Sequence, residues 1–434
     1  MKDPRKIVVS REVLVPFILI TSLFALWGFA NDITNPMVAA FKTIMEISNA
    51  KAALIQFAFY GGYATMAIPA ALIVKRYSYK TGIIIGLALY AIGALLFLPA
   101  AHYEVFGFFL VSLYILTFGL AFLETTANPY ILAMGAEETA TRRLNLAQSF
   151  NPMGSLIGMF VASQVILTAL DSDKRDTTGN LIFDTLSISE KAVIRTHDLS
   201  IIRNPYVMLG LVVIIMLVII ATSKMPKRAR ADHSIHAMDS FKRLIKNINY
   251  REGVIAQVFY VGAQIMCWTF IIQYADNLGI PKAVAQRYNI IAMGIFLLSR
   301  FISTMLMKYL NSRFLLMLFA IGGILTTTGV ILIQGMAGLY LLIGASAFMS
   351  LMFPTIYGIA LEGVGDDATL GAAGLVMAIV GGALMPPLQG LIIDQGTIGW
   401  LPAVNFSFIL PLICFVAIAI YGYRAYKVHP KLLM

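Results

Sequence analysis

Long apolar stretches, separated by short polar segments, make up most of this 434-residue chain. An α-helix needs about 20 consecutive apolar residues to cross the hydrocarbon core of a bilayer, so each stretch predicts one membrane-spanning helix. The stretches that meet this requirement are 14–41, 52–74, 82–101, 105–134, 145–170, 204–224, 251–276, 284–310, 314–334, 337–361, 370–394 and 400–426. The pattern therefore predicts an all-α integral membrane protein with twelve transmembrane helices.

The spans fall into two groups of six, separated by a polar and basic segment. This layout is typical of transporters built from two parallel six-helix halves. We expect an N-terminal half over 1–224, a cytoplasmic linker over 225–250 and a C-terminal half over 251–434.

The composition agrees with a membrane location, and the basic residues predict the orientation. Hydrophobic residues make up 59% of the chain, charged residues 12%, and the mean hydropathy is +0.81. Lys and Arg gather after spans 2, 4, 6, 8 and 12. By the positive-inside rule these ends face the cytoplasm, which predicts that both termini are cytoplasmic. The net charge of +10 follows from this orientation, so we do not expect a nucleic-acid partner.

Several classes of chemistry have little support in the sequence. The two cysteines, Cys267 and Cys414, both fall within apolar spans, which argues against a disulfide framework or a thiolate metal site. The five histidines lie outside the spans or at their edges. Because no nucleophile–base constellation or phosphate-binding loop is present, we expect neither an enzyme nor a cofactor or metal.

Two acidic residues lie inside apolar spans, where a charge has little water to solvate it. Glu124 lies deep in span 4 and Asp32 interrupts span 1. A charged side chain at the bilayer centre costs roughly 2.5 to 3.5 kcal/mol on insertion scales, and such residues usually serve ions, protons or polar substrates. The alternative is a buried ion pair with Arg300, which we place nearer the inner end of span 8. The two acids favour a transporter in which a carboxylate binds and releases a proton.

Amide side chains accompany these acids at similar depths. Asp32 and Asn35 lie one turn apart on one helix face, and Gln148 and Asn151 have the same spacing. Asn128 and Gln264 add amides in spans 4 and 7. Interhelical hydrogen bonding explains any one of them, but their clustering favours a cavity lined with groups that donate and accept. Such a cavity suits a neutral polyhydroxyl ligand.

Two tryptophans also lie too far inside their spans to belong to an interfacial aromatic belt. Trp27 and Trp268 occupy similar depths in spans 1 and 7. Their rings suit stacking on the apolar face of a sugar, and plain packing explains them equally well.

Longer segments carry a resemblance that covers nearly the whole chain. The segments FALWGFAN (24–31), ALIQFAFYGGY (53–63), LETTANPY (123–130), RLNLAQSFNPMG (143–154), AQVFYVGAQIMCW (256–268) and SAFMSLMFPTIY (346–357) closely resemble the L-fucose:proton symporters of the major facilitator superfamily. The resemblance implies the major facilitator fold, alternating access and a multi-pass location in a bacterial inner membrane. The family also includes glucose, galactose and other hexose permeases.

The resemblance also implies roles for particular residues. Glu124 matches the family's membrane-embedded glutamate, which is tied to proton handling. Gln148 and Asn151 match polar cavity residues, and Gln264 and Trp268 fall in the matching helix 7 motif.

One departure from the family pattern concerns the first span. The fucose permeases have an essential aspartate where this chain has Asn35, and they have asparagine where this chain has Asp32. We interpret this as a carboxylate moved one turn along the same helix face, so that Asp32 takes over coupling. The alternative is that Glu124 alone couples.

These observations lead us to expect proton-coupled import of a neutral monosaccharide, L-fucose or a related hexose. The expected partners are the monosaccharide, the proton and membrane lipid, and we expect a monomer. The candidate substrate-binding residues are Trp27, Asp32, Asn35, Glu124, Asn128, Gln148, Asn151, Gln264 and Trp268, with Glu124 and Asp32 as the proton-coupling pair. An uncoupled sugar facilitator and a proton-driven drug exporter are the alternatives.

Overall fold

The computed structural model describes residues 8–34, 37–47, 54–174, 176, 181–225, 237–280, 282–393 and 395–427. These residues are almost entirely helical, apart from β1 (Thr397–Ile398) and β2 (Leu401–Pro402), which pair antiparallel with Thr397 opposite Pro402. The α-helices before residue 225 are α1 (Leu14–Thr34), α2 (Met37–Ile44), α4 (Leu54–Arg76), α5 (Tyr79–Leu95), α6 (Phe97–Tyr103), α7 (Phe106–Ala133), α8 (Ala140–Gln148), α9 (Asn151–Val161) and α10 (Ile188–Thr222). Those that follow are α11 (Ala237–Lys246), α12 (Ile248–Asn277), α13 (Lys282–Leu306), α14 (Ser312–Leu332), α15 (Met336–Met349), α16 (Met352–Ala360), α17 (Ala368–Met377), α18 (Gly381–Ile393), α19 (Ala403–Phe406) and α20 (Ile409–Lys427).

Twelve helical segments of the described chain are long and apolar enough to cross a membrane, which confirms the number of spans predicted from hydropathy. The largest difference in position concerns span 6, because α10 begins at Ile188 rather than at 204. Ser187 caps this helix: its hydroxyl accepts a hydrogen bond from the Glu190 backbone, and Glu190 Oε2 accepts one from the Ser187 N–H at 2.9 Å. The first turns of α10 are polar and so carry no hydropathy signal.

Several spans are broken within the membrane. α8 ends at Gln148 and α9 begins at Asn151, while α15 ends at Met349 and α16 begins at Met352. Carbonyl groups at a helix end have no partner within the helix, and irregular backbone at membrane depth is tolerated where it lines a cavity or is buried in protein. These breaks therefore supply backbone acceptors in the middle of the bundle.

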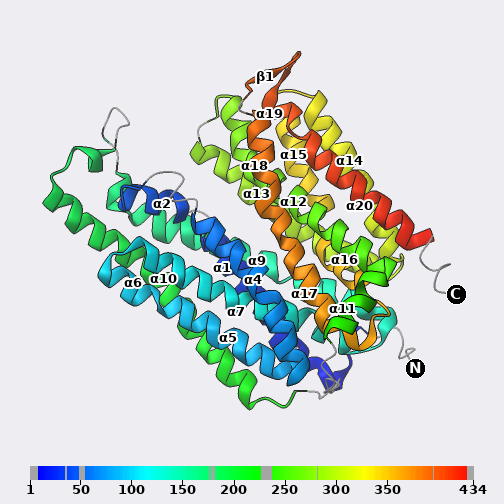
Figure 1. The fold of residues 1–434 in the computed structure, drawn as a ribbon. Helices are drawn as coiled ribbons and strands as arrows, with labels where there is room; N and C mark the ends of the chain where they lie inside the picture. The colour runs from blue at the N-terminus through cyan, green and yellow to red at the C-terminus, as the bar shows by residue number, and fades with distance from the viewer. Residues whose placement is uncertain are drawn as a thin grey trace.

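The helices form two groups that approach each other at one end of the molecule (Figure 1). Helices α1 to α10 pack on one side and α12 to α20 on the other, and the groups diverge toward α2 and β1. Hydrogen bonds cross between them at the close end, where Asn145 Nδ2 donates to Thr355 Oγ1 at 3.1 Å and the Tyr79 and Thr369 hydroxyls lie 3.3 Å apart. The two groups are therefore joined at this end and diverge away from it (Figure 1).

The short helix α11, in the predicted linker, packs at the same close end. Its Ser240 hydroxyl accepts a hydrogen bond from Lys75 Nζ at 3.0 Å. Arg243 of α11 binds both carboxylate oxygens of Asp367 at 2.8 Å. α11 thus contacts both groups of helices.

Close packing of α1 against α9 depends on glycine. A Cβ atom at Gly154 would lie 1.8 Å from the Ala25 carbonyl oxygen, and one at Gly28 would lie 2.0 Å from the Asn151 carbonyl oxygen. Because both obstacles are backbone atoms, neither site accepts a side chain without moving a helix. Gly28 of span 1 and Gly154 of span 5 therefore serve helix packing.

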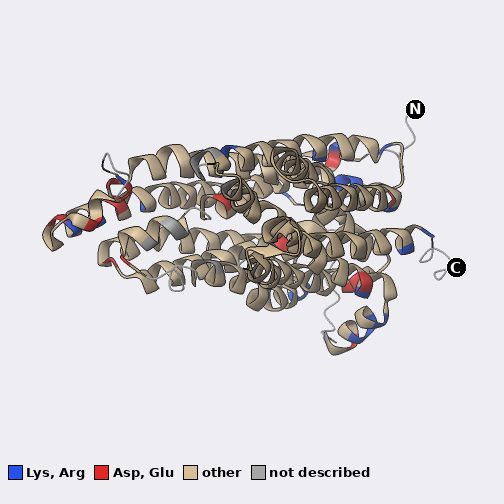
Figure 2. Ribbon diagram, turned by 90° about the horizontal axis from the view of Figure 1, so that it is seen from above, with Lys and Arg blue, Asp and Glu red and all other residues tan. Residues whose placement is uncertain are grey.

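Among the residues that Figure 2 colours, charged ones concentrate toward the two ends of the bundle, and few lie in the middle. This distribution is expected of helices whose middle sections lie in hydrocarbon. The few charged residues in the middle therefore need a separate explanation.

Candidate substrate cavity

A cavity lies between the two groups of helices. Its empty volume is about 1010 Å³, a value that includes the space open to solvent. Its lining combines polar and aromatic side chains from both groups, which is typical of small-molecule sites. The polar and tryptophan side chains of the lining are Trp27, Asn31, Asp32, Tyr60, Tyr63, Glu124, Gln148, Asn151, Ser155, Tyr260, Gln264, Trp268 and Arg300.

Most of the predicted site residues meet in this cavity. Trp27, Asp32, Glu124, Gln148, Asn151, Gln264 and Trp268 all line it. Asn35 lies outside the described residues. Asn128 is fully buried and is not part of the lining, so the expectation of a direct cavity position differs from the structure at this residue.

Glu124 brings a carboxylate into the cavity from α7. Its side chain is only 6% exposed. No lysine, arginine or histidine of the described chain forms a salt bridge with it. A carboxylate held in this way has little to stabilise its charged form apart from cavity water, so proton binding at this site removes a large desolvation cost.

Arg300 does not supply the ion pair that the sequence left open. This guanidinium, on α13, lines the same cavity but donates to backbone carbonyl oxygens, those of Ser350 and, at 3.1 Å, of Gln148. It also lies over the Phe296 ring, 4.6 Å from the centroid. Backbone oxygens at the ends of α15 and α8 thus take the place of a carboxylate.

Asp32 reaches the cavity from α1, near the end of that helix, and is partly exposed. The structure therefore brings two carboxylates, Asp32 and Glu124, from two helices to one space. Asn31, the neighbour of Asp32, also lines the cavity.

The amides form hydrogen bonds that fix their positions. Gln148 Nε2 donates to Asn128 Oδ1 at 2.8 Å, so the buried Asn128 acts behind the lining and orients Gln148. Asn151 Nδ2 donates to the Phe24 carbonyl at 3.2 Å, which ties α9 to α1. Interhelical bonding and cavity lining therefore occur together in the same side chains.

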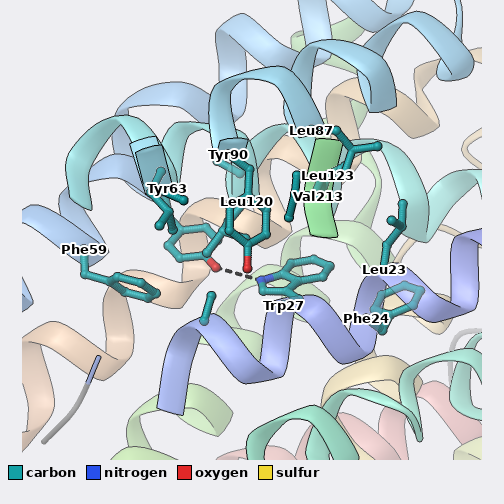
Figure 3. Packing of buried hydrophobic residues seen from close by; sticks show 14 of the residues in the cluster. Leu23, Phe24, Trp27, Phe59, Tyr63, Leu87, Tyr90, Leu120, Leu123 and Val213 are labelled. Atoms are coloured by element: carbon teal, nitrogen blue, oxygen red, sulfur yellow. Dashed lines mark hydrogen bonds between the residues drawn. The ribbon is translucent and has the colours of Figure 1, made fainter. Parts of the chain in front are cut away.

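The two tryptophans are also fixed by their neighbours. Trp27 Nε1 donates to the Tyr63 hydroxyl at 2.8 Å, as Figure 3 shows, and the Trp27 ring stacks with Phe24 at a centroid distance of 5.4 Å. Trp268 Nε1 donates to Ser346 Oγ at 3.1 Å, and its ring meets Phe296 edge to face at 5.0 Å. Because both indole N–H groups are already bonded, the rings contribute surface rather than donors to the cavity.

Several lining residues are not predicted by hydropathy or helical spacing. Tyr60, Tyr63 and Tyr260 line the cavity although each lies in an apolar span, where aromatic residues usually form the helix-packing core. Their positions depend on how helices from the two groups face each other. The resemblance to the family is the available indication, since ALIQFAFYGGY carries Tyr60 and Tyr63 and AQVFYVGAQIMCW carries Tyr260.

Among the described residues, one group outside the cavity has the composition of a metal site. Asp171, His197 and Asp198 present ligand atoms within 4.8 Å of one another. These groups have protein partners: Asp198 accepts backbone N–H bonds from Asp171 and Ser172 at 3.0 and 2.8 Å, and Lys174 lies 2.6 Å from Asp171. The hydrogen bond from Lys174 holds the pKa of the Asp171 carboxyl below its usual range. These hydrogen bonds attach the segment of Asp171 and Ser172 to α10.

Comparison with known proteins agrees with this fold and cavity. The Major Facilitator Superfamily model matches residues 18–380. The chain is 70% identical to the L-fucose-proton symporter of Haemophilus influenzae, over 97% of this chain and 99% of that protein. It is 34% identical to the L-fucose-proton symporter of Escherichia coli K12, over 95% and 93% of the two chains.

A solved structure leads to the same family. The crystal structure of the major facilitator superfamily transporter FucP in the outward conformation matches with a TM-score of 0.87 at 32% identity, over 96% of this chain and 99% of that one. The chain therefore belongs to the L-fucose-proton symporter family of the major facilitator superfamily, as a multi-pass protein of the bacterial inner membrane.

Proposed function

We propose that this protein imports a neutral monosaccharide together with a proton, by alternating access, and that L-fucose is its leading substrate. The observation that carries the proposal is the cavity in which Glu124 and Asp32 meet amides and aromatic rings between the two groups of helices. The names of the relatives supply the sugar and the proton as the transported pair.

The transport cycle follows from the cost of a buried charge. In the outward-open state a proton binds to Glu124 or Asp32, and the neutralised cavity then closes around the sugar at lower cost. The two halves rock about the site, and proton and sugar leave on the inner side. One proton moving down about 100 mV contributes roughly 2.3 kcal/mol, which corresponds to a roughly 50-fold accumulation of sugar.

We assign Gln148, Asn151 and Gln264 to the sugar hydroxyls, and Trp27 and Trp268 to the apolar face of the ring. In this assignment Asn128 acts through Gln148. Asn35, which lies outside the described residues, stays a predicted substrate-binding residue. We further propose that the protein works as a monomer, with both termini in the cytoplasm, halves at 1–224 and 251–434, and a linker at 225–250.

Uptake of labelled sugar into proteoliposomes, with and without an inward proton gradient, tests this proposal. We expect L-fucose to accumulate above the external concentration with the gradient and only to equilibrate when a protonophore is added. Equilibration in both conditions would instead indicate an uncoupled facilitator. Export of lipophilic cations without sugar uptake would indicate a drug exporter.

A further inference from the structure

The transport cycle proposed above leaves one buried charge in the cavity without a role. Arg300 is 3% exposed and lines the cavity from α13, in the C-terminal group of helices. A guanidinium is always protonated at physiological pH. The protein therefore keeps a permanent cation beside a space that we assign to a neutral ligand.

The protein stabilises this cation with helix ends rather than with a carboxylate. Arg300 Nε donates to the Ser350 carbonyl, directly after α15, and Nη1 donates to the Gln148 carbonyl, the last residue of α8, at 3.1 Å. The C-terminal end of a helix carries a partial negative charge, which favours a nearby cation. Two such ends meet at Arg300, so its charge is stabilised without an ion pair to Glu124.

These bonds leave part of the guanidinium unused. Arginine has five N–H donors, and the two bonds to carbonyls use one on Nε and one on Nη1. Nη2 donates to no atom of the described protein. Because Arg300 lines the cavity and Nη2 is not among the buried side-chain atoms that lack a partner, this group is open to the cavity, where water or a ligand can accept its hydrogen bonds.

One of the two bonds also spans the gap between the groups of helices. Ser350 belongs to the same group as Arg300, whereas Gln148 lies on α8 in the other group. One turn before Gln148, Asn145 of α8 donates to Thr355 across the same boundary. Both crossing bonds can exist only while α8 lies against α13 and α16.

We propose that Arg300 is a sugar-binding residue, whose Nη2 donates to an oxygen of the monosaccharide, and that its bond to the Gln148 carbonyl holds it in this position only while the inner ends of the halves are in contact. Opening of the inner side breaks that bond, frees the guanidinium to turn and weakens the grip on the sugar. Arg300 thereby lowers sugar affinity at the moment of release. This inference rests on the proposed sugar transport.

A double-mutant cycle, in which Arg300 and the sugar oxygen are each removed, tests the contact directly. The full chain, purified in detergent, is titrated calorimetrically with L-fucose and with its monodeoxy analogues, and the same series is repeated with Arg300→Met and Arg300→Lys. We expect Arg300→Met to weaken L-fucose binding about tenfold or more, the size expected for a hydrogen bond from a charged donor. The deoxy analogue that lacks the contacted oxygen should bind the original protein more weakly than L-fucose does. This difference in affinity should disappear in Arg300→Met, because the donor to that oxygen has been removed.

The variants distinguish a contact from a structural role. Arg300→Lys keeps the charge but not the forked donors, so we expect weak binding from it as well. Arg287→Met, at an exposed position of the same helix, should bind as the original protein does. The inference is wrong if each deoxy analogue loses as much affinity, relative to L-fucose, in Arg300→Met as it does in the original protein. If Arg300→Met does not fold, the same comparison is made with Arg300→Lys. If the original protein binds no monosaccharide, the proposed function itself falls.

Discussion

At the scale of single residues, coupling depends on a carboxylate that can lose and regain its proton inside the membrane. Glu124 meets this requirement because it is buried, lines the cavity and has no salt bridge among the described residues. Arg300 would prevent such titration if it formed an ion pair with Glu124, but its Nε and Nη1 groups donate to the Ser350 and Gln148 carbonyls instead. This arrangement allows a cation and a protonatable acid to share one cavity.

Glu124→Gln tests the role of this carboxylate. Glutamine resembles the protonated acid in shape and cannot release a proton, so the variant should still exchange sugar across the membrane but lose accumulation. We expect the accumulation ratio in energised vesicles to fall from tens to about one, while counterflow of labelled L-fucose continues. Glu12→Gln, at an exposed position, serves as the control and should accumulate sugar normally. Undiminished accumulation by Glu124→Gln would remove Glu124 from coupling.

Asp32→Asn tests whether a second acid takes part in proton coupling. If Asp32 replaces the family aspartate that is absent at Asn35, the Asn variant should also lose accumulation while keeping counterflow. The measurement is uptake of labelled sugar with an imposed proton gradient. Full accumulation by Asp32→Asn would show that Glu124 couples alone.

At the scale of helices, the cavity depends on breaks and close contacts. The interruption between α8 and α9 places Gln148 and Asn151 at the end of one helix and the start of the next, and α9 lies against α1 through Gly28 and Gly154. A shift of α9 would move Asn151 and its bond to Phe24 as well. Helix packing and site geometry are therefore linked.

Gly154→Ala should disturb both the packing of α9 against α1 and the geometry of the cavity. The added methyl group would lie 1.8 Å from the Ala25 carbonyl oxygen, and overpacking of this kind typically costs about 1 to 3 kcal/mol. We expect a lower melting temperature of the purified protein and weaker sugar binding. The matched control is Gly294→Ala on α13, where a Cβ atom has no neighbour within 4 Å. Equal stability of the two variants would contradict the packing role of Gly154.

The sequence predicted the elements better than the distances between them. Hydropathy was sufficient for the twelve spans because each is long and apolar, and helical spacing identified polar residues such as Gln148 and Asn151. The clustering of amides at similar depths also predicted that Asn128 lines the cavity, whereas in the structure this side chain lies behind Gln148. Depth along a helix can be predicted from sequence, but rotation toward a cavity depends on neighbouring helices. For the same reason, hydropathy and helical spacing did not predict that Tyr63 and Tyr260 line the cavity.

At the scale of the whole molecule, the two groups of helices meet at the end that carries α11, α16 and α17 (Figure 1). The crossing bonds at that end include Asn145 to Thr355 and Tyr79 to Thr369. If the termini are cytoplasmic, as the basic loops predict, these contacts close the inner side, and the two groups diverge toward the outer side (Figure 1). Such a state is ready to accept sugar and proton.

Thr355→Val should shift the balance toward the inward-open state. The change removes the acceptor of the Asn145 bond at nearly constant volume, and a net loss of about 0.5 to 1.5 kcal/mol changes a two-state equilibrium roughly two- to tenfold. A cysteine reporter in the cavity, Ile265→Cys, should then react more slowly with a membrane-impermeant thiol reagent added outside. Thr326→Val is the control, since that hydroxyl bonds only within its own helix. Unchanged labelling in Thr355→Val would show that this bond does not hold the inner side closed.

The most direct test of proton-coupled sugar import is the external pH of lightly buffered, de-energised cells that express the protein. Addition of L-fucose should make the medium more alkaline, because each sugar that enters takes a proton with it. Cells that express Glu124→Gln should take up labelled L-fucose by exchange without this pH change. If the original protein exchanges labelled sugar while the external pH stays constant, the protein is a facilitator and the account of coupling is wrong.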